Sequence, residues 1–240
     1  MAANKKIGIK ASAQDNFLQP DAVTGLTATN VGTNRAYNDG AVSLSWTLAA
    51  TSPAATSYTI TTTPATTTVT TGNANTSYTF TGLASNTSYT FTVKGTNAAG
   101  TANPTTSSSV TVTTVPQAPQ SVSASATSAN LNTISWSVGA DGGNAITSYT
   151  INGSDGTSYT GISASATSYA ATDNTPSAAS PGSQTYTVIA INGNGSSTGS
   201  TTGTVTTTPP FFPFFPPFFP FFPFFPFFPP FFPFFPYFPF

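Results

Sequence analysis

The last 32 residues of the chain, Pro209 to Phe240, place the strongest limit on how it can fold. They read PPFFPFFPPFFPFFPFFPFFPPFFPFFPYFPF, with proline at nearly every third position. Proline has no N–H donor and clashes with the preceding helical turn, so this segment forms neither a helix nor a central β-strand. The remaining regular conformation is the polyproline II helix. At about 3.1 Å per residue it gives a rod on the order of 100 Å long, with phenylalanines along two of its three edges.

The aromatic side chains of such a rod need a partner surface. Eighteen phenylalanines, at roughly 2 kcal/mol each for full burial, represent tens of kcal/mol of apolar driving force. A disordered tail is typical of polar Pro/Ser/Gln segments and not of aromatic ones. A membrane anchor is disfavoured because the rod is about three times longer than the hydrocarbon core, and its Phe N–H groups would be unpaired in lipid. We therefore predict a docking tail that is buried in protein, either among sister chains, with a trimer favoured, or in a groove of a partner.

The predicted assembly residues are the aromatic side chains of this docking tail. They are Phe211, Phe212, Phe214, Phe215, Phe218, Phe219, Phe221, Phe222, Phe224, Phe225, Phe227, Phe228, Phe231, Phe232, Phe234, Phe235, Tyr237, Phe238 and Phe240.

The composition of the chain excludes most binding and catalytic chemistry. Charged residues make up 5% of the sequence and the net charge is -1, so no field steers nucleic acid or anionic lipid to it. The absence of Cys and His removes Ser-His and Cys-His dyads and the usual zinc ligands. Paired carboxylates would have to come from six isolated aspartates, namely Asp15, Asp21, Asp39, Asp141, Asp155 and Asp173. We predict a protein that is not an enzyme, with no catalytic, metal-binding or cofactor-binding residue and no cofactor.

Residues 1–20 are predicted to be an N-terminal arm. Two lysines are followed by Ile-Gly-Ile-Lys instead of a long apolar run, so the segment does not have the pattern of a secretory signal peptide. Lys5, Lys6 and Lys10 form the basic cluster of the chain. Two interpretations stay open: a solvated leader, or an arm that docks onto a neighbouring subunit.

The following 188 residues, 21–208, predict antiparallel strands. Apolar and polar residues alternate in AVSLSW, SYTI, SYTF, SYTFTVKG and SVTV, in segments about 10 to 15 residues apart with no helical period. Threonine favours strands, whereas Gly, Asn and Ser favour turns. The pattern predicts an all-β fold of two-sheet sandwiches.

The same order of segments occurs twice, which predicts two tandem domains, residues 21–115 and 116–208. TISW (133–136) matches SLSW (43–46), TSYTI occurs at both 56–60 and 147–151, SYAAT (168–172) matches SYTFT (77–81), and SQTYTVIAINGNG (183–195) matches SYTFTVKGTNAAG (88–100). Pro116 and Pro119 between the copies predict a short, stiff connector. The predicted core residues are Trp46 and Tyr89 in the first copy and Trp136 and Tyr186 in the second.

These repeated blocks resemble the fibronectin type III domain. Trp46 stands where that family keeps a tryptophan on its second strand, and GLASNTSYTFTVKGTNAAG (82–100) is similar to its turn, sixth-strand and Asn-x-x-Gly pattern. The resemblance implies a tyrosine corner made by Leu83 and Tyr89. In the second copy Gln184 stands opposite Tyr89, so the corner departs from the pattern there. The resemblance implies a sandwich fold and no activity.

Low charge, absent Cys, tandem sandwiches and a Thr/Ser/Asn/Gly-rich body also resemble accessory proteins of tailed-phage virions, such as decoration, neck-appendage and fibre proteins. This resemblance implies a structural protein located in the virion, with other virion proteins and copies of itself as partners, no nucleic acid and no membrane span. The alternative is an extracellular or cell-surface adhesin that binds host-surface glycans. Tyr58, Tyr78, Tyr149, Tyr159 and Tyr169 would stack on sugars if exposed, although alternation places most of them in the core or on one strand face.

Overall fold

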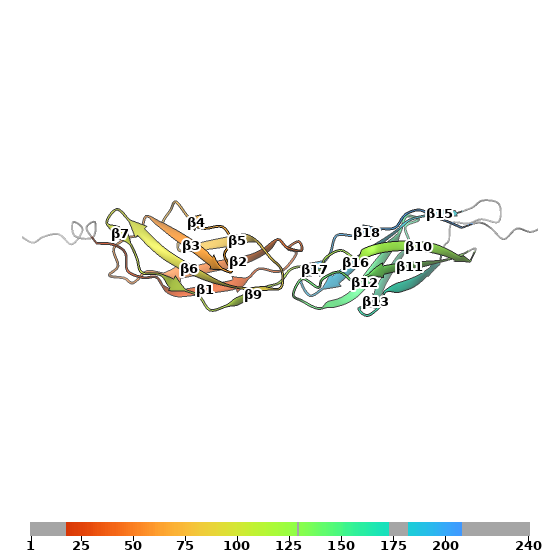
Figure 1. Ribbon diagram of the computed structural model, residues 1–240, viewed down its shortest axis with the longest axis horizontal. Helices are drawn as coiled ribbons and strands as arrows, with labels where there is room; N and C mark the ends of the chain where they lie inside the picture. The colour runs from red at the N-terminus through yellow and green to blue at the C-terminus, as the bar shows by residue number, and fades with distance from the viewer. Residues whose placement is uncertain (1–17, 129, 173–181, 208–240) are drawn as a thin grey trace, which may run out of the picture. The chain divides into compact units, whose positions relative to one another are not determined.

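The computed structural model describes residues 18–128, 130–172 and 182–207 (Figure 1). The chain divides into two units, Met1–Pro209 and Pro210–Phe240, and all of the described residues belong to the first. Most of the predicted N-terminal arm and the whole docking tail, with every predicted assembly residue, lie outside the described residues.

Every regular element in the described residues is a β-strand, so the predicted all-β fold is confirmed. The first domain contains β1 (Thr24–Asn30), β2 (Gly40–Thr47), β3 (Ser57–Thr63), β4 (Val69–Thr70), β5 (Ser77–Leu83), β6 (Thr87–Asn97), β7 (Gly100–Thr101), β8 (Thr105–Thr106) and β9 (Val110–Val112). The second contains β10 (Gln120–Ser128), β11 (Leu131–Ser137), β12 (Ile146–Gly153), β13 (Ser158–Ser163), β14 (Ser168–Thr172), β15 (Gly182–Gln184), β16 (Tyr186–Asn192), β17 (Gly195–Ser196), β18 (Ser200–Thr201) and β19 (Val205–Thr207).

The first domain is a sandwich of two antiparallel sheets. One sheet has the order β1-β2-β5 and the other has the order β4-β3-β6, with β7, β8 and β9 pairing in turn along the free edge of β6. These three short segments act as one interrupted edge strand. Such interruption leaves no long, flat edge that could pair with another chain.

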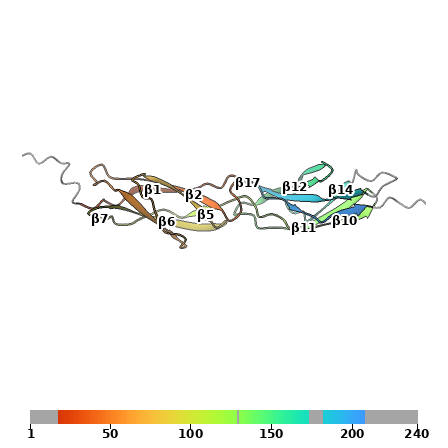
Figure 2. The same cartoon turned by 90° about the horizontal axis from the view of Figure 1, so that it is seen from above.

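The second domain repeats this arrangement. Its sheets are β10-β11-β14 and β13-β12-β16, with β17 and β18 along the edge of β16, while β15 and β19 form a further pair. The strand order of these two sheets is the same as in the first domain, where β1-β2-β5 and β4-β3-β6 are the corresponding strands. The two sheets of each domain can be followed from two directions in Figures 1 and 2.

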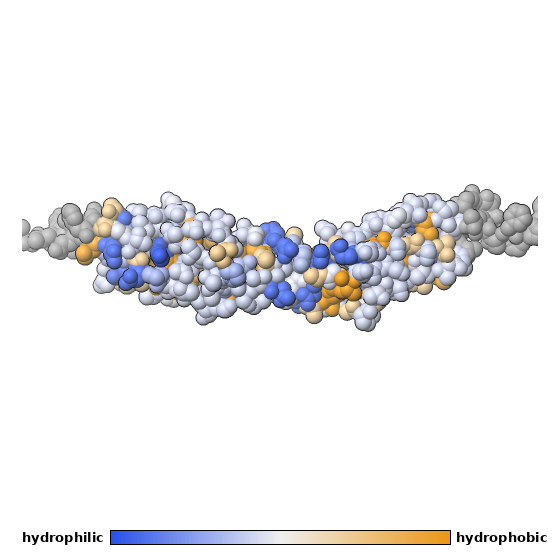
Figure 3. Space-filling model, viewed as in Figure 1, coloured by the Kyte–Doolittle hydropathy of each residue, from blue (hydrophilic) through white to orange (hydrophobic). Residues whose placement is uncertain are grey.

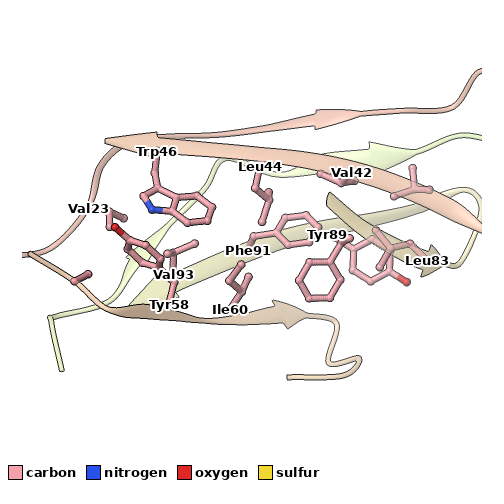
Figure 4. Packing of buried hydrophobic residues seen from close by; sticks show 13 residues of the cluster. Val23, Val42, Leu44, Trp46, Tyr58, Ile60, Leu83, Tyr89, Phe91 and Val93 are labelled. Carbon is pink, nitrogen blue, oxygen red and sulfur yellow. The ribbon is translucent and has the colours of Figure 1, made fainter. Parts of the chain in front are cut away.

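Each domain has a hydrophobic core of its own. In the first domain the inward residues of β2, β3 and β6 meet between the sheets (Figure 4). Its buried members are Val23, Val42, Leu44, Trp46, Ala55, Tyr58, Ile60, Phe80, Leu83, Tyr89, Phe91, Val93 and Val112. Those of the second are Ile134, Trp136, Tyr149, Ile151, Ile162, Ala171, Tyr186, Val188, Ala190 and Val205. Alternation along each strand therefore separates core from surface, as the period of two requires.

The outward faces carry hydroxyl groups instead of charges. Thr92 and Thr106 pair across β6 and β8 with 2.9 Å between their hydroxyl oxygens, and Thr187 and Thr201 pair in the same way at 2.9 Å in the second domain. Figure 3 accordingly shows a surface of mostly intermediate hydropathy over the described residues. Nowhere in residues 18–128, 130–172 and 182–207 is there a helix with the length and apolarity needed to cross a membrane.

Candidate functional site

The predicted core residues lie between the sheets. Trp46 is 3% exposed and meets the ring of Tyr58 edge-on, with 4.9 Å between ring centroids (Figure 4). Trp136 is 4% exposed and lies 5.1 Å from the ring of Tyr149. Both domains thus place a Trp–Tyr contact at the same position, which adds aromatic attraction to the apolar area that is buried.

Tyr89 occupies the corner position in the first domain. Its side chain is 4% exposed, and its hydroxyl oxygen accepts a hydrogen bond from the backbone N–H of Ala84 at 3.3 Å. Leu83 is buried beside it at the end of β5. The sixth strand is thereby tied to the turn that precedes it.

The second domain replaces this corner by a buried polar chain. Asn132 Nδ2 donates to the Tyr186 hydroxyl at 2.8 Å, and that hydroxyl donates to Gln184 Oε1 at 2.8 Å. These residues stand where the first domain has Val42, Phe91 and Tyr89. The sequence signalled only that Gln184 departs from the corner pattern. The participation of Asn132 was missed, because an isolated Asn on a predicted strand does not reveal what lies opposite it.

The described aspartates lie outside the strands, in loops and turns. Asp39 pairs with Arg35 at 2.9 Å, and Asp141 Oδ1 accepts from the N–H of Gly143 at 2.8 Å. Burial raises the pKa of Asp155, but hydrogen bonds from the Thr157 hydroxyl at 2.6 Å and the Thr157 N–H at 2.9 Å outweigh it and hold that pKa below its usual value. Within the part of the chain that the structure describes, no three His, Cys, Asp or Glu residues gather as metal ligands.

The tyrosines considered for sugar stacking divide into two groups. Tyr58 and Tyr149 are fully buried, so neither ring is available to a glycan, and burial also raises the pKa of Tyr149. Tyr78, Tyr159 and Tyr169 are half-buried. The rings of Tyr159 and Tyr169 contact each other with 5.2 Å between centroids, and the Tyr159 hydroxyl donates to the Thr172 carbonyl at 2.8 Å. Only part of each of these rings faces solvent.

The segment that joins the two sandwiches is hydrogen-bonded to both. Asn30 Nδ2 donates to the Thr113 hydroxyl at 2.8 Å, and the Val115 N–H donates to the Arg35 carbonyl at 2.9 Å, both on the side of the first domain. On the other side the N–H of Thr114 donates to the Gly142 carbonyl at 2.9 Å. The connector is therefore held as part of the fold.

In each domain, one asparagine side chain is hydrogen-bonded to a backbone carbonyl of the segment that leads into that domain. Asn192 is 5% exposed, and its Nδ2 lies within hydrogen-bonding distance of the carbonyls of Thr114 (2.9 Å), Asp141 (2.8 Å) and Asn144 (3.1 Å). In the first domain Asn97 Nδ2 contacts the carbonyls of Leu18 (2.8 Å) and Ala54 (3.3 Å). These are the asparagines of the Asn-x-x-Gly pattern noted in the sequence, but the sequence did not show what they bind.

The candidate binding site is an open groove beside this connector, which we call the junction groove. It offers about 560 Å³ of space and has no charged residue in its wall. Its walls are Asn34, Ala36, Tyr37, Val115, Pro116, Gln117, Ala118, Gln120, Ser196 and Thr198. Amides and hydroxyls around an apolar floor suit an uncharged ligand with hydrogen-bond acceptors.

The strand order and the repeated core place the described chain in the class of fibronectin type III-like sandwiches. Residues 21–112 match the family model of the fibronectin type III domain. The predicted fold class of the sandwich domains is thus confirmed, while the docking tail remains a prediction. No curated protein matches the chain.

Several solved structures are similar to this chain. The FN1-FN3 domains of chicken CNTN1 are 20% identical, with 80% of this chain and 68% of that chain covered and a TM-score of 0.43. A two-domain fibronectin type III segment of chicken tenascin is 19% identical, with 79% and 100% covered and a TM-score of 0.37. The protein FN3tt mut is 25% identical, with 39% and 97% covered and a TM-score of 0.32.

Proposed function

We propose that this chain is a non-catalytic structural protein that displays two sandwich domains and is attached to its assembly by the docking tail. The observation that supports this most is that each domain packs a hydrophobic core of its own, with members from Val23 to Val205. The sequence continues with eighteen phenylalanines, which are apolar side chains in addition to those of the two cores. Apolar surface of this extent is typical of an interaction site.

The proposed setting is a tailed-phage virion, where the chain acts as a decoration, neck-appendage or fibre protein. Its partners are other virion proteins and sister copies, with a trimer favoured because a polyproline II strand repeats every three residues. The nearly uncharged, hydroxyl-rich surface of the domains supports a role that does not depend on electrostatic steering.

A surface adhesin is the second candidate. The contact between Tyr159 and Tyr169 favours it, because both rings are half-buried and lie together near a sheet edge, where a sugar ring could pack against them. This candidate places the protein at a cell surface or outside the cell.

Two experiments separate these proposals. A mass-spectrometric inventory of purified virions should find the protein in a fixed ratio to the major capsid protein if it is a virion component, whereas its absence would contradict that setting. A glycan array tests the adhesin. Binding that is lost in a Tyr159→Ala variant, with folding intact, would favour the adhesin, and an array without binding would count against it.

A further inference from the structure

We propose that the junction groove binds the Phe/Pro docking tail of a second copy of this chain. This inference rests on the proposed function, in which the tail is the attachment element, and it names the surface that receives the tail. The groove lies within the described residues and belongs to neither core.

The floor of the junction groove is apolar and partly rigid. Pro116 and Val115 are buried beneath the groove, with Val115 6% exposed, so the apolar contact surface comes from Ala36, Ala118 and Tyr37. Tyr37 is half-buried, so one part of its ring remains available for contact. Aromatic side chains line the grooves in which polyproline II strands dock, and Tyr37 is the aromatic residue of this groove.

The rim of the groove supplies hydrogen-bond donors. Gln117 uses its N–H and its Oε1 to bind Ala140, and no described contact occupies its Nε2. The Tyr37 hydroxyl likewise makes no hydrogen bond within the described residues, and Ser196 and Thr198 add hydroxyls. A polyproline II strand has no internal hydrogen bonds, so its carbonyls are all available to such donors.

The docking tail has the matching chemistry. It lacks charge, and it is the stretch of this sequence in which proline recurs at nearly every third position. A charged peptide would fit less well, because the groove has no opposite charge to compensate for the desolvation of an ion. One turn of polyproline II is about 9 Å long, so the groove would receive a short part of the 32-residue tail. The rest of the tail stays available for contacts with sister tails.

Self-association of the full chain tests the groove. Tyr37→Ala removes the ring, and Thr198→Arg puts a charged side chain at the rim. Asn103→Arg is the matched control, because it occupies the equivalent exposed loop position of the first domain. By sedimentation equilibrium we expect both groove variants to weaken self-association at least tenfold, while Asn103→Arg associates like the parent chain.

A photo-cross-link identifies the occupant. Full chains with benzoylphenylalanine in place of Tyr37 are mixed with ¹⁵N-labelled full chains, and the adducts are mapped by mass spectrometry. We expect unlabelled groove peptide joined to ¹⁵N-labelled peptide from residues 209–240. An adduct only within one chain, or an adduct to another part of the second copy, would overturn the proposal.

Truncation of the tail and substitution in the groove separate the attachment role of the tail from the assignment of the groove. If a chain ending at Thr208 no longer associates but both groove variants associate normally, the tail still attaches and only the groove assignment is wrong. If the chain ending at Thr208 associates like the full chain, the attachment role itself is wrong.

Discussion

At the residue scale, three buried positions separate the polar interior of the second domain from the corner of the first. Val42, Tyr89 and Phe91 of the first domain become Asn132, Gln184 and Tyr186 in the second. The three polar residues are each 0% or 1% exposed, and hydrogen bonds connect them in one chain. A buried polar group is tolerated when its partners are present and is costly when one partner is removed.

Tyr186→Phe should therefore destabilise the second domain by about 1–3 kcal/mol, because it removes the hydroxyl that binds both Asn132 and Gln184. Tyr89→Phe, which loses one bond of 3.3 Å, should cost less. Adding Asn132→Val to Tyr186→Phe restores the residue types of the first domain at these positions and should recover part of the loss. Urea unfolding measures the stability of all three variants. A Tyr186→Phe variant as stable as the parent protein would show that the hydrogen bonds among Asn132, Tyr186 and Gln184 do not stabilise the domain.

Trp46→Ala should cost the first domain about 3–5 kcal/mol, since it removes a large side chain that is 3% exposed. The chain has two tryptophans, so in this variant the fluorescence of Trp136 reports the second domain alone. We expect circular dichroism to show an early loss of strand signal while the Trp136 transition stays in place. An unchanged urea midpoint for the whole chain would contradict the role given to Trp46.

At the element scale, the sequence predicted the strands that alternate over many residues and missed the short ones. β2, β3, β6 and β12 follow directly from their period of two, because one face of each is buried. The two-residue segments β7, β8, β17 and β18 have no readable period, and they are recognised only by their pairing with β6 or β16.

The junction was predictable only in part. Two prolines indicated a stiff connector, but hydrogen bonds between side chains and distant carbonyls have no sequence period. Asn192 is the example: it ends the alternating strand β16, yet its side chain is buried against three carbonyls. The Tyr37 side of the groove gave no sequence signal, because its loop carries neither alternation nor a motif.

Asn192→Ala should lower the stability of the second domain by about 1–3 kcal/mol, because the carbonyls of Thr114, Asp141 and Asn144 lose their shared donor. Asn97→Ala in the first domain should cost less, since Asn97 is only half-buried and contacts two carbonyls. Asn103→Ala, at an exposed loop position, is the control. Urea unfolding followed by tryptophan fluorescence checks the expectation for Asn192, and a change in midpoint no larger than that of Asn103→Ala would refute it.

At the scale of the whole molecule, a chain with few charges contains two domains whose surfaces carry hydroxyls and whose own aromatic residues lie mostly in or against their cores. The residues of the two described cores account for the fold of each sandwich. Attachment, in this account, belongs to the docking tail. In its predicted polyproline II conformation, the tail would gain free energy only when protein surrounds it, because one flat surface cannot bury both phenylalanine edges of such a rod.

The most direct test is the behaviour of a chain that ends at Thr208, compared with the full chain by sedimentation and thermal unfolding. We expect the shortened chain to be soluble and monomeric, to melt at the temperature of the domains in the full chain, and to be missing from the native assembly. Serine in place of alternate tail phenylalanines should weaken assembly progressively, with leucine milder. If the shortened chain enters its assembly normally, the docking tail is not the attachment element and the central claim is wrong.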